Sequence, residues 1–327
     1  MEIRIFTREL VLADVYDGAM TVEAEECFDS VGTFSLTVPI TDADRFSPEE
    51  IVYVPVTDGA YVIERVTKDA DTMTAEIGGR SVLSYFERCA LPDTKTVHGT
   101  AEEVLLSLVR THGDRVLGAP LLTVGAGRSE AVNAVLGGST LLSAMRAVCA
   151  QSGLGMRLSV MEGLFVFSVL GREADGTVLS RDRGDLLFGD VHTDIKNYVN
   201  RVIVASSGGV RVTVDAADLF ADGIDDGAYP LHERYHYAED VTPDRFDTEE
   251  AHRAALFFEG KRFLSRRRPV RTVTVSLSAA RAASLAIGTE ASVEDTLLGF
   301  SGKAYLSRKK IRVSSTDTEY GAEMTLL

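Results

Sequence analysis

The sequence predicts a mainly β protein in which two β-rich parts flank an α+β insertion. Short segments with alternating apolar and polar residues fill the first 90 positions, and this alternation returns from Ile195 onward. Between these parts the hydrophobic period becomes helical. Short strands at a spacing of about 8–12 residues are typical of antiparallel barrels or sandwiches. We therefore divide the 327 residues into three expected domains, 1–92, 93–194 and 195–327.

The first domain is expected to be a β-barrel. Its clearest strand is 33–38, where apolar and hydroxyl residues alternate strictly and Gly32 and Pro39 bracket the run. Turn signals such as Asp58-Gly59 separate the expected strands. The same pattern predicts further strands at 2–6, 22–28, 51–54, 61–66 and 73–77.

The second domain is expected to hold two helices and a hairpin. Thr100 and Glu103 have the spacing of a capping box, and the apolar residues after them recur at helical spacing up to Gly113. A hairpin is expected to join 156–160 to 164–169.

The other expected helix of this domain begins at Ser139 or Thr140 and ends at Gly153. Cys149 lies on its apolar stripe, so we expect a small buried hydrophobe there. Together, the two helices and the hairpin form an insertion between the β-rich parts.

The third domain is expected to be a second β-barrel with one helix near 247–266. Asp247 is a plausible N-cap, and the helix ends in a basic run before Pro269, where positive charge suits the helix dipole. Strands are expected at 198–204, 210–214, 271–277, 290–293, 302–306, 311–314 and 322–327.

Composition and charge exclude several classes of protein. The chain has 34 Lys and Arg against 49 Asp and Glu, a net charge of −15, which argues against duplex DNA binding by bulk charge. Its hydrophobic fraction of 45% excludes a disordered chain. Apolar runs fall far short of the roughly 18 residues of a membrane helix, and the N-terminus has no features of a secretory signal. We therefore expect no membrane anchoring and folding in a cytoplasm.

The three cysteines, Cys27, Cys89 and Cys149, are widely spaced and form no C-x-x-C pair. Such a set predicts neither a zinc ribbon nor a disulfide framework, and it fits a reducing compartment.

His232 to His236 spells H-E-R-Y-H, the H-E-x-x-H pattern of zinc peptidases. On a helix, the two histidines would face one zinc ion, and Glu233 would activate its water. Glu249, Glu250 and Glu259 are candidates for a third ligand, although none stands in a ligand motif. A zinc-dependent peptidase is therefore one alternative function. The other interpretation is a chance spelling in a strand or loop.

The remaining motifs predict no chemistry. The glycines of 124–128 lack the third spaced glycine of a dinucleotide site, and the acids of 215–226 do not follow the order of a calcium loop. Nothing assembles a nucleophile, a base and an oxyanion donor, so we expect no enzyme, no cofactor and no catalytic, cofactor-binding or metal residue. A host-surface binding module is a further alternative, which would show an exposed aromatic cluster. The absence of Trp disfavours it.

Five segments, taken in order, resemble the tail-hub proteins of long-tailed phages, which are also called baseplate hub or tail-tip proteins, and those of related injection machines. The run 32–39 (GTFSLTVP) is similar to their G-x-F-x-[LF]-x-[IV]-P strand, and 61–66 matches the strand that follows. The stretch 79–88 resembles G-R-x-L-x-x-x-L-x-R. Segments 197–204 and 287–295 resemble N-x-V-x-V and L-G-D-x-V-x-V-x-D, with Thr289 in place of the usual Asp.

This resemblance implies a structural role without catalysis. Two hub-type β-barrels per subunit would form a homotrimeric, pseudo-sixfold ring at the distal end of a phage tail tube. The ring would join the sixfold distal tail ring or tube to a threefold tip or spike, and it would line or close the lumen for DNA passage during genome ejection.

The partners that the resemblance implies are copies of the chain itself, the distal tail protein ring, the tape measure protein, and tail-tip, spike or receptor-binding proteins. DNA would be met only in passage. The location would be the virion tail, assembled in the host cytoplasm. In this family, the region 229–240 is ordinarily extended, which disfavours the zinc site.

Overall fold

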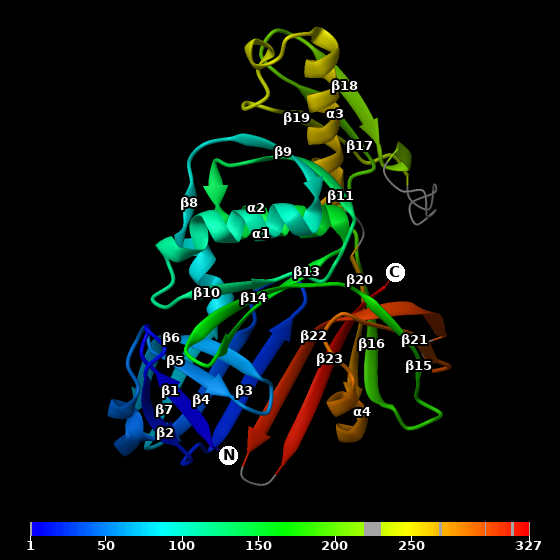
Figure 1. Ribbon diagram of the computed structural model, residues 1–327. Coiled ribbons are helices and arrows are strands. Elements are labelled where there is room, and N and C mark those ends of the chain that lie inside the picture. Colours follow the sequence, from blue (N-terminus) through cyan, green and yellow to red (C-terminus); the bar gives the residue numbers. More distant parts are fainter. Residues whose placement is uncertain (1, 219–229, 268–269, 298, 315–316, 327) are drawn as a thin grey trace.

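The computed structural model describes residues 2–218, 230–267, 270–297, 299–314 and 317–326. Two β-rich parts lie side by side at the base, the helical insertion lies above the first, and a small unit built on one long helix projects beyond it (Figure 1). The predicted mainly β fold with a helical insertion is confirmed.

The first β-rich part is antiparallel throughout. Phe34, Leu36 and Val38 are buried along one face of their strand, as the alternation predicts. The 3-10 turn η1 (Ile40–Arg45) covers one end. The strands are β1 (Ile3–Phe6), β2 (Leu12–Tyr16), β3 (Thr21–Cys27), β4 (Thr33–Pro39), β5 (Ile51–Val54), β6 (Gly59–Asp69) and β7 (Thr74–Ser81).

The insertion packs two helices against small sheets. The Thr100 hydroxyl accepts a hydrogen bond from the Glu103 backbone N–H at 3.3 Å, so the predicted capping box is confirmed. Gly153 ends the second helix with a φ of 70°, in the left-handed region. The elements are η2 (Val82–Arg88), β8 (Ala90–Leu91), β9 (Lys95–Thr100), α1 (Ala101–His112), η3 (Gly113–Arg115), β10 (Leu121–Val124), β11 (Ala131–Leu136), β12 (Ser139–Thr140), α2 (Leu141–Ser152), β13 (Gly155–Met161) and β14 (Leu164–Leu170).

The second β-rich part is built from strands on both sides of position 195. Its strands from 173–194 lie inside the range predicted as the insertion, yet they pair with strands near the C-terminus. The strand pairing therefore crosses the predicted boundary at 194. The division of the chain into three domains stays a prediction. The elements are β15 (Glu173–Ser180), β16 (Leu186–Asp194), β20 (Val270–Leu277), α4 (Ala279–Ser284), β21 (Thr289–Asp295), β22 (Phe300–Ser314) and β23 (Thr318–Leu326).

The α3 unit, residues 195–267 as far as they are described, lies in the chain between β16 and β20. It packs one helix on a three-stranded sheet of order β18-β17-β19. Thr248, not the predicted Asp247, caps the helix by accepting from the Ala251 N–H at 3.1 Å. The elements are β17 (Arg201–Ala205), β18 (Arg211–Asp215), η4 (Ala216–Asp218), β19 (Glu233–Tyr237), η5 (Pro243–Arg245) and α3 (Glu249–Ser265).

The buried apolar side chains form separate cores. One core joins the first part to the insertion, because Ile51 and Val62 pack in the same cluster as Leu105 and Phe165. The second β-rich part and the α3 unit each have a core of their own. The first part and the insertion therefore behave as one body, to which the others are attached.

Gly79 lies where β7 crosses β6 closely, and a Cβ there would clash with the backbone carbonyl of Val62. We predict that Gly79→Ala lowers the free energy of unfolding by about 1–3 kcal/mol, because two paired strands must separate. Chemical denaturation measures the loss. Gly321→Ala in β23 is the control, since a Cβ there meets only ordinary contacts. Equal losses in both variants would contradict the explanation.

Candidate functional site

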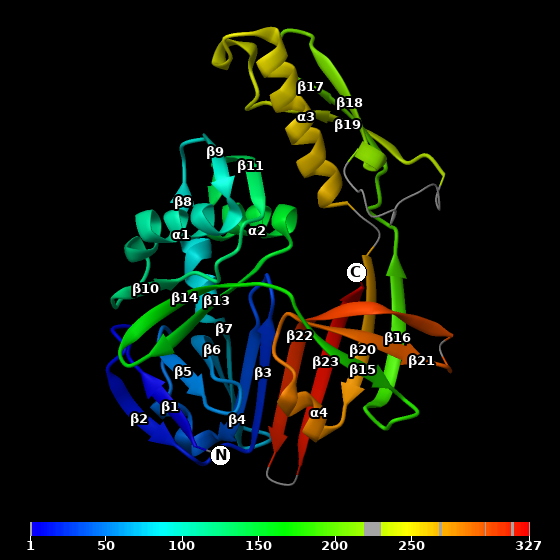
Figure 2. The ribbon, with the colours of Figure 1, turned by 45° about the vertical axis from the view of Figure 1, so that its right-hand side comes forward.

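The two β-rich parts meet where β3 pairs antiparallel with β22, from Thr21 opposite Ser314 to Cys27 opposite Arg308. This pairing makes one continuous sheet of thirteen strands. Eleven of them follow the path order β16-β20-β23-β22-β3-β4-β7-β6-β5-β1-β2, and β21 and β15 branch off from β22. Figure 2 shows β3 and β22 side by side at the centre of the molecule. We call this seam the junction.

Opposite charges line one face of the junction. Glu25 lies 3.4 Å from Arg308, and Glu23 lies 2.8 Å from Lys310 and 3.4 Å from Arg312. These pairs are partly exposed, so each contributes at most about 1 kcal/mol. Their main effect is on register, because a shift by one residue would move every charge to the other face.

The other face of the junction carries a more deeply placed pair. Glu26 lies opposite Lys309 in the register. Burial raises the pKa of Glu26 above its ordinary value despite the nearby cations, and burial lowers the pKa of Lys309. The Lys309 ammonium donates to the Leu285 carbonyl at 3.2 Å. Arg157 of β13 reaches to 3.7 Å from the Glu26 carboxylate, so the insertion joins the same charged group.

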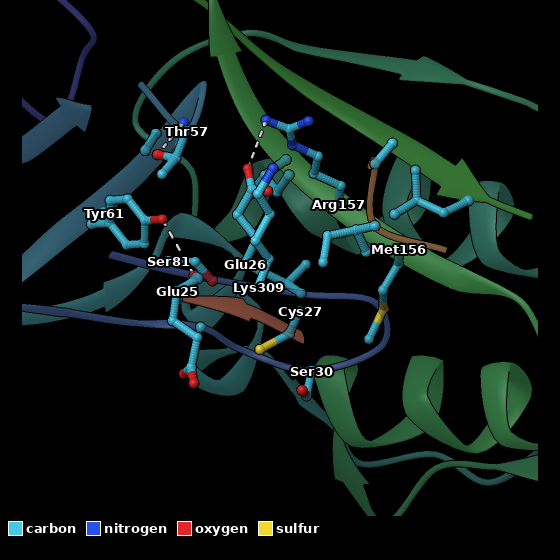
Figure 3. A pocket seen from close by; sticks show the side chains of 18 of the residues that line it. Glu25, Glu26, Cys27, Ser30, Thr57, Tyr61, Ser81, Met156, Arg157 and Lys309 are labelled. Carbon is cyan, nitrogen blue, oxygen red and sulfur yellow. Dashed lines mark hydrogen bonds and ion pairs between the residues drawn. The ribbon is translucent and has the colours of Figure 1, made fainter. Parts of the chain in front are cut away.

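A cavity of about 280 Å³ lies beside this group (Figure 3). First-part side chains, insertion side chains and second-part side chains all contribute to its wall. Burial raises the pKa of the Cys27 thiol, so a nucleophilic thiolate is disfavoured there. The Tyr61 hydroxyl is already engaged, since it donates to the Glu25 carbonyl at 3.3 Å. The arrangement positions three parts of the chain and does not assemble a nucleophile with a base.

The H-E-R-Y-H segment does not form the helix that a zinc peptidase needs. Residues 233–236 lie in the strand β19 and His232 comes directly before it, so in this extended chain His232 and His236 are about 13 Å apart instead of facing one ion. The His232 ring packs against Tyr198, and the His236 Nε2 lies 3.1 Å from Glu259 Oε1. No group of three potential metal ligands occurs among the described residues. Of the three carboxylates considered as ligands, only Glu259 meets a histidine of the motif.

Glu259 instead ties the α3 unit to the insertion. Its carboxylate also accepts from Arg262 at 2.8 Å, and Arg262 donates to the Val135 carbonyl of β11 at 3.2 Å. Burial by itself raises the pKa of Glu259, but the hydrogen bonds from His236 and Arg262 outweigh it. The pKa therefore lies below the ordinary value.

The glycine loop 124–128 holds an anion supplied by the chain itself. The Glu102 carboxylate of α1 accepts from the backbone N–H groups of Ala126, Gly127 and Arg128 at 3.0, 3.2 and 2.8 Å. Convergent N–H groups of this kind form an anion nest. Its occupant here is a side chain, so the loop has a structural role and is no dinucleotide site.

Asp215 pairs with Arg201 at 2.6 Å, and most of the later acids lie outside the described residues.

Cys149 is buried and free, as expected for a small hydrophobe. Tyr235 and Tyr237 are 58% and 48% exposed on β19, an aromatic pair that the sequence did not single out. Among the described helices, none has the length and hydrophobicity to cross a bilayer.

The Glu26–Lys309 pair predicts unequal effects of two neighbouring lysines. Lys309→Met removes one of the two cations beside the largely buried Glu26 carboxylate and leaves Arg157, so we expect a loss of about 1–3 kcal/mol in unfolding free energy at pH 7.5. The loss should shrink as the pH falls, because Glu26, whose pKa is raised, takes up a proton and then needs no cation beside it. Lys310→Met, at the exposed pair, is the control with a smaller effect. Equal, pH-independent losses would contradict this.

Glu259 predicts a second pH-dependent loss of stability. Its folded pKa is lowered, so its stabilisation is present above the unfolded pKa of about 4.5 and is lost as pH falls through the folded pKa. Glu259→Gln should cost about 1–3 kcal/mol at pH 7 and less at pH 4, below the unfolded pKa. Urea unfolding at both pH values measures this. Glu250→Gln, exposed on the same helix, should cost little at either pH.

No protein-family model and no curated protein matches the sequence. Solved structures do match the fold. The 43 kDa tail protein of prophage MuSo2 from Shewanella oneidensis has a TM-score of 0.64 and 10% identity, covering 99% of this chain and 98% of that one. The tail protein from Neisseria meningitidis has a TM-score of 0.60 and 14% identity, covering 99% and 95%. A chain of the phage P2 baseplate in its activated conformation with Ca has a TM-score of 0.52 and 10% identity, covering 99% and 98%.

These matches extend over nearly the whole length of both partners, so they concern the arrangement of all parts of the chain. They include both β-rich parts, the insertion and the α3 unit. The resemblance predicted from the ordered motifs is therefore confirmed at the level of the fold. This chain has the fold of phage tail and baseplate proteins.

Proposed function

We propose that the chain is a structural tail-hub protein, located in the virion tail. The observation that carries this proposal is the junction, which joins two β-rich parts of one subunit side by side in a single sheet. A subunit that supplies two β-rich parts to a ring needs three copies to match a sixfold tube. The fold likeness to tail and baseplate proteins supports the same role.

In this proposal, three subunits form a ring at the distal end of the tail tube. The two barrels are built on residues 1–92 and on the strands of 195–327, with β15 and β16 added to the second. The insertion, 93–194, gives the first barrel its shared core. The ring joins the distal tail protein ring or tube to a threefold tip or spike, with the tape measure protein and receptor-binding proteins as further partners. It lines or closes the lumen for DNA passage.

The free ends of the sheet support contacts between ring neighbours. At one end, β2 pairs with β1 alone among the described strands. The backbone groups of Val15 are already hydrogen-bonded to side chains. The Val15 N–H donates to the Asp14 carboxylate at 2.8 Å, and the Val15 carbonyl accepts from Arg45 at 3.3 Å. These bonds hinder addition of a further strand there. The neighbour would therefore meet this edge through side chains, including the exposed Leu12 and Val15.

We propose no catalytic activity for the chain, because the junction and the other sites described above position structure and do not activate a nucleophile. The acidic charge of −15 would keep DNA from adhering as it passes. Assembly would take place in the host cytoplasm. The peptidase alternative has lost its structural basis, since its motif lies on a strand.

Native mass spectrometry of the purified protein from zinc-containing buffer tests this proposal. We expect a complex of three 35.4 kDa chains without bound metal. A monomer carrying one zinc ion, lost in the Glu233→Gln variant, would instead restore the peptidase. A metal-free monomer at every concentration tested would contradict self-assembly into a trimer.

A further inference from the structure

A groove with a volume of about 450 Å³ lies beside α2, between the loop after β3 and the end of α3. Arg146 of α2 and Arg266, the C-cap residue of α3, both line it. Both residues are exposed, and neither guanidinium has an ion pair or side-chain hydrogen bond with any described residue. The ends of the two helices approach each other in Figure 2.

Arg266 lies among like charges. Partial loss of hydration lowers its pKa, Arg262, Arg267 and Arg146 lower it further, and Glu259 offsets part of this effect. Cations at the C-terminal end of a helix are ordinarily explained by the helix dipole. That explanation covers the arginines of α3 but not Arg146, which projects from the middle of α2. A basic cluster drawn from two helices is unusual on a chain of net charge −15 and favours an anion between its members.

The other groups in the groove leave that positive charge largely uncompensated. Glu87 is already bound to Arg80 at 2.6 Å. Asp29 is the one other carboxylate among the described lining residues. The hydroxyls of Thr140 and Ser143 add hydrogen-bond donors at the same wall. The groove thus offers two free guanidinium groups and two hydroxyls against one carboxylate.

We propose that this groove binds the carboxylates of an acidic segment of a partner protein, with Arg146 and Arg266 as the recognising groups. Guanidinium groups pair with carboxylates through two parallel hydrogen bonds, which gives both energy and orientation. A nucleic acid would need a basic stripe that follows its backbone. The groove is a local cluster on an acidic chain, and a short acidic protein segment fits it better.

The test uses the full chain and a fluorescent hexaglutamate peptide, followed by fluorescence anisotropy. We expect the peptide to bind, and to bind more weakly as salt rises from about 50 to about 200 mM. The Arg146→Gln, Arg266→Gln double variant should bind it roughly tenfold more weakly. Arg183→Gln is the matched control, because Arg183 is an exposed arginine between β15 and β16, and it should bind like the original chain.

Equal binding of the peptide by the original chain and the double variant, or no binding by either, would overturn the proposal. Tighter binding of a single-stranded oligonucleotide through the same arginines would assign the groove to nucleic acid instead. Inorganic phosphate binding without peptide binding would reduce it to a free-anion site. If the double variant misfolds by circular dichroism, the Arg146→Lys, Arg266→Lys variant replaces it. That variant keeps the charge and should still bind more weakly, because lysine lacks the paired hydrogen bonds.

Discussion

The antiparallel pairing of β3 with β22 is the constraint on which the rest of this structure depends. It joins strands that lie almost at opposite ends of the sequence and turns two β-rich parts into one sheet. Backbone hydrogen bonds provide the pairing, and the glutamates of β3 facing the basic residues of β22 fix its register. Without the pairing, the second β-rich part would be attached mainly through chain connections.

The separate hydrophobic cores show which parts of the chain are packed together as one rigid body and which are not. The first part and the insertion share buried side chains, so they cannot move apart without exposing apolar surface. Between this body and the second part lie a cavity with both polar and apolar lining and the facing residues Glu26 and Lys309, instead of a continuous apolar core. The α3 unit is held to the insertion through the Glu259–Arg262 group. Polar contacts and the packing of Phe28 on Tyr305 therefore connect bodies whose interiors are apolar.

The sequence predicted the elements whose signals are local. Alternation located β4, and the spacing of Thr100 and Glu103 located the start of α1, because both patterns depend on residues within one turn or strand. It did not predict β15 and β16 as members of the second β-rich part, because their partners lie about a hundred residues further along the chain. Partner choice between distant strands leaves no local signature.

The candidate site followed the same division. The H-E-x-x-H pattern was visible in the sequence. Its extended conformation, which separates the two histidines, comes from the parallel pairing of β19 with β17, and this is a tertiary contact. The junction was missed, although its signal was present: the glutamates of 23–26 and the basic run 308–312 are complementary in charge. Only the observed register shows that these two segments meet.

The distance between β3 and β22 along the chain also matters during synthesis. Once β3 has left the ribosome, its partner is still roughly 280 residues away, which at about 5–20 residues per second means a delay of about 15 to 55 seconds. During that time one edge of β3 has no strand beside it and is open to wrong neighbours. Glu23, Glu25 and Glu26 lie on this edge strand, and negative charges repel other acidic nascent chains. The glutamates that later pair with the basic residues of β22 thus also disfavour association of the exposed β3 edge with other chains before β22 is made.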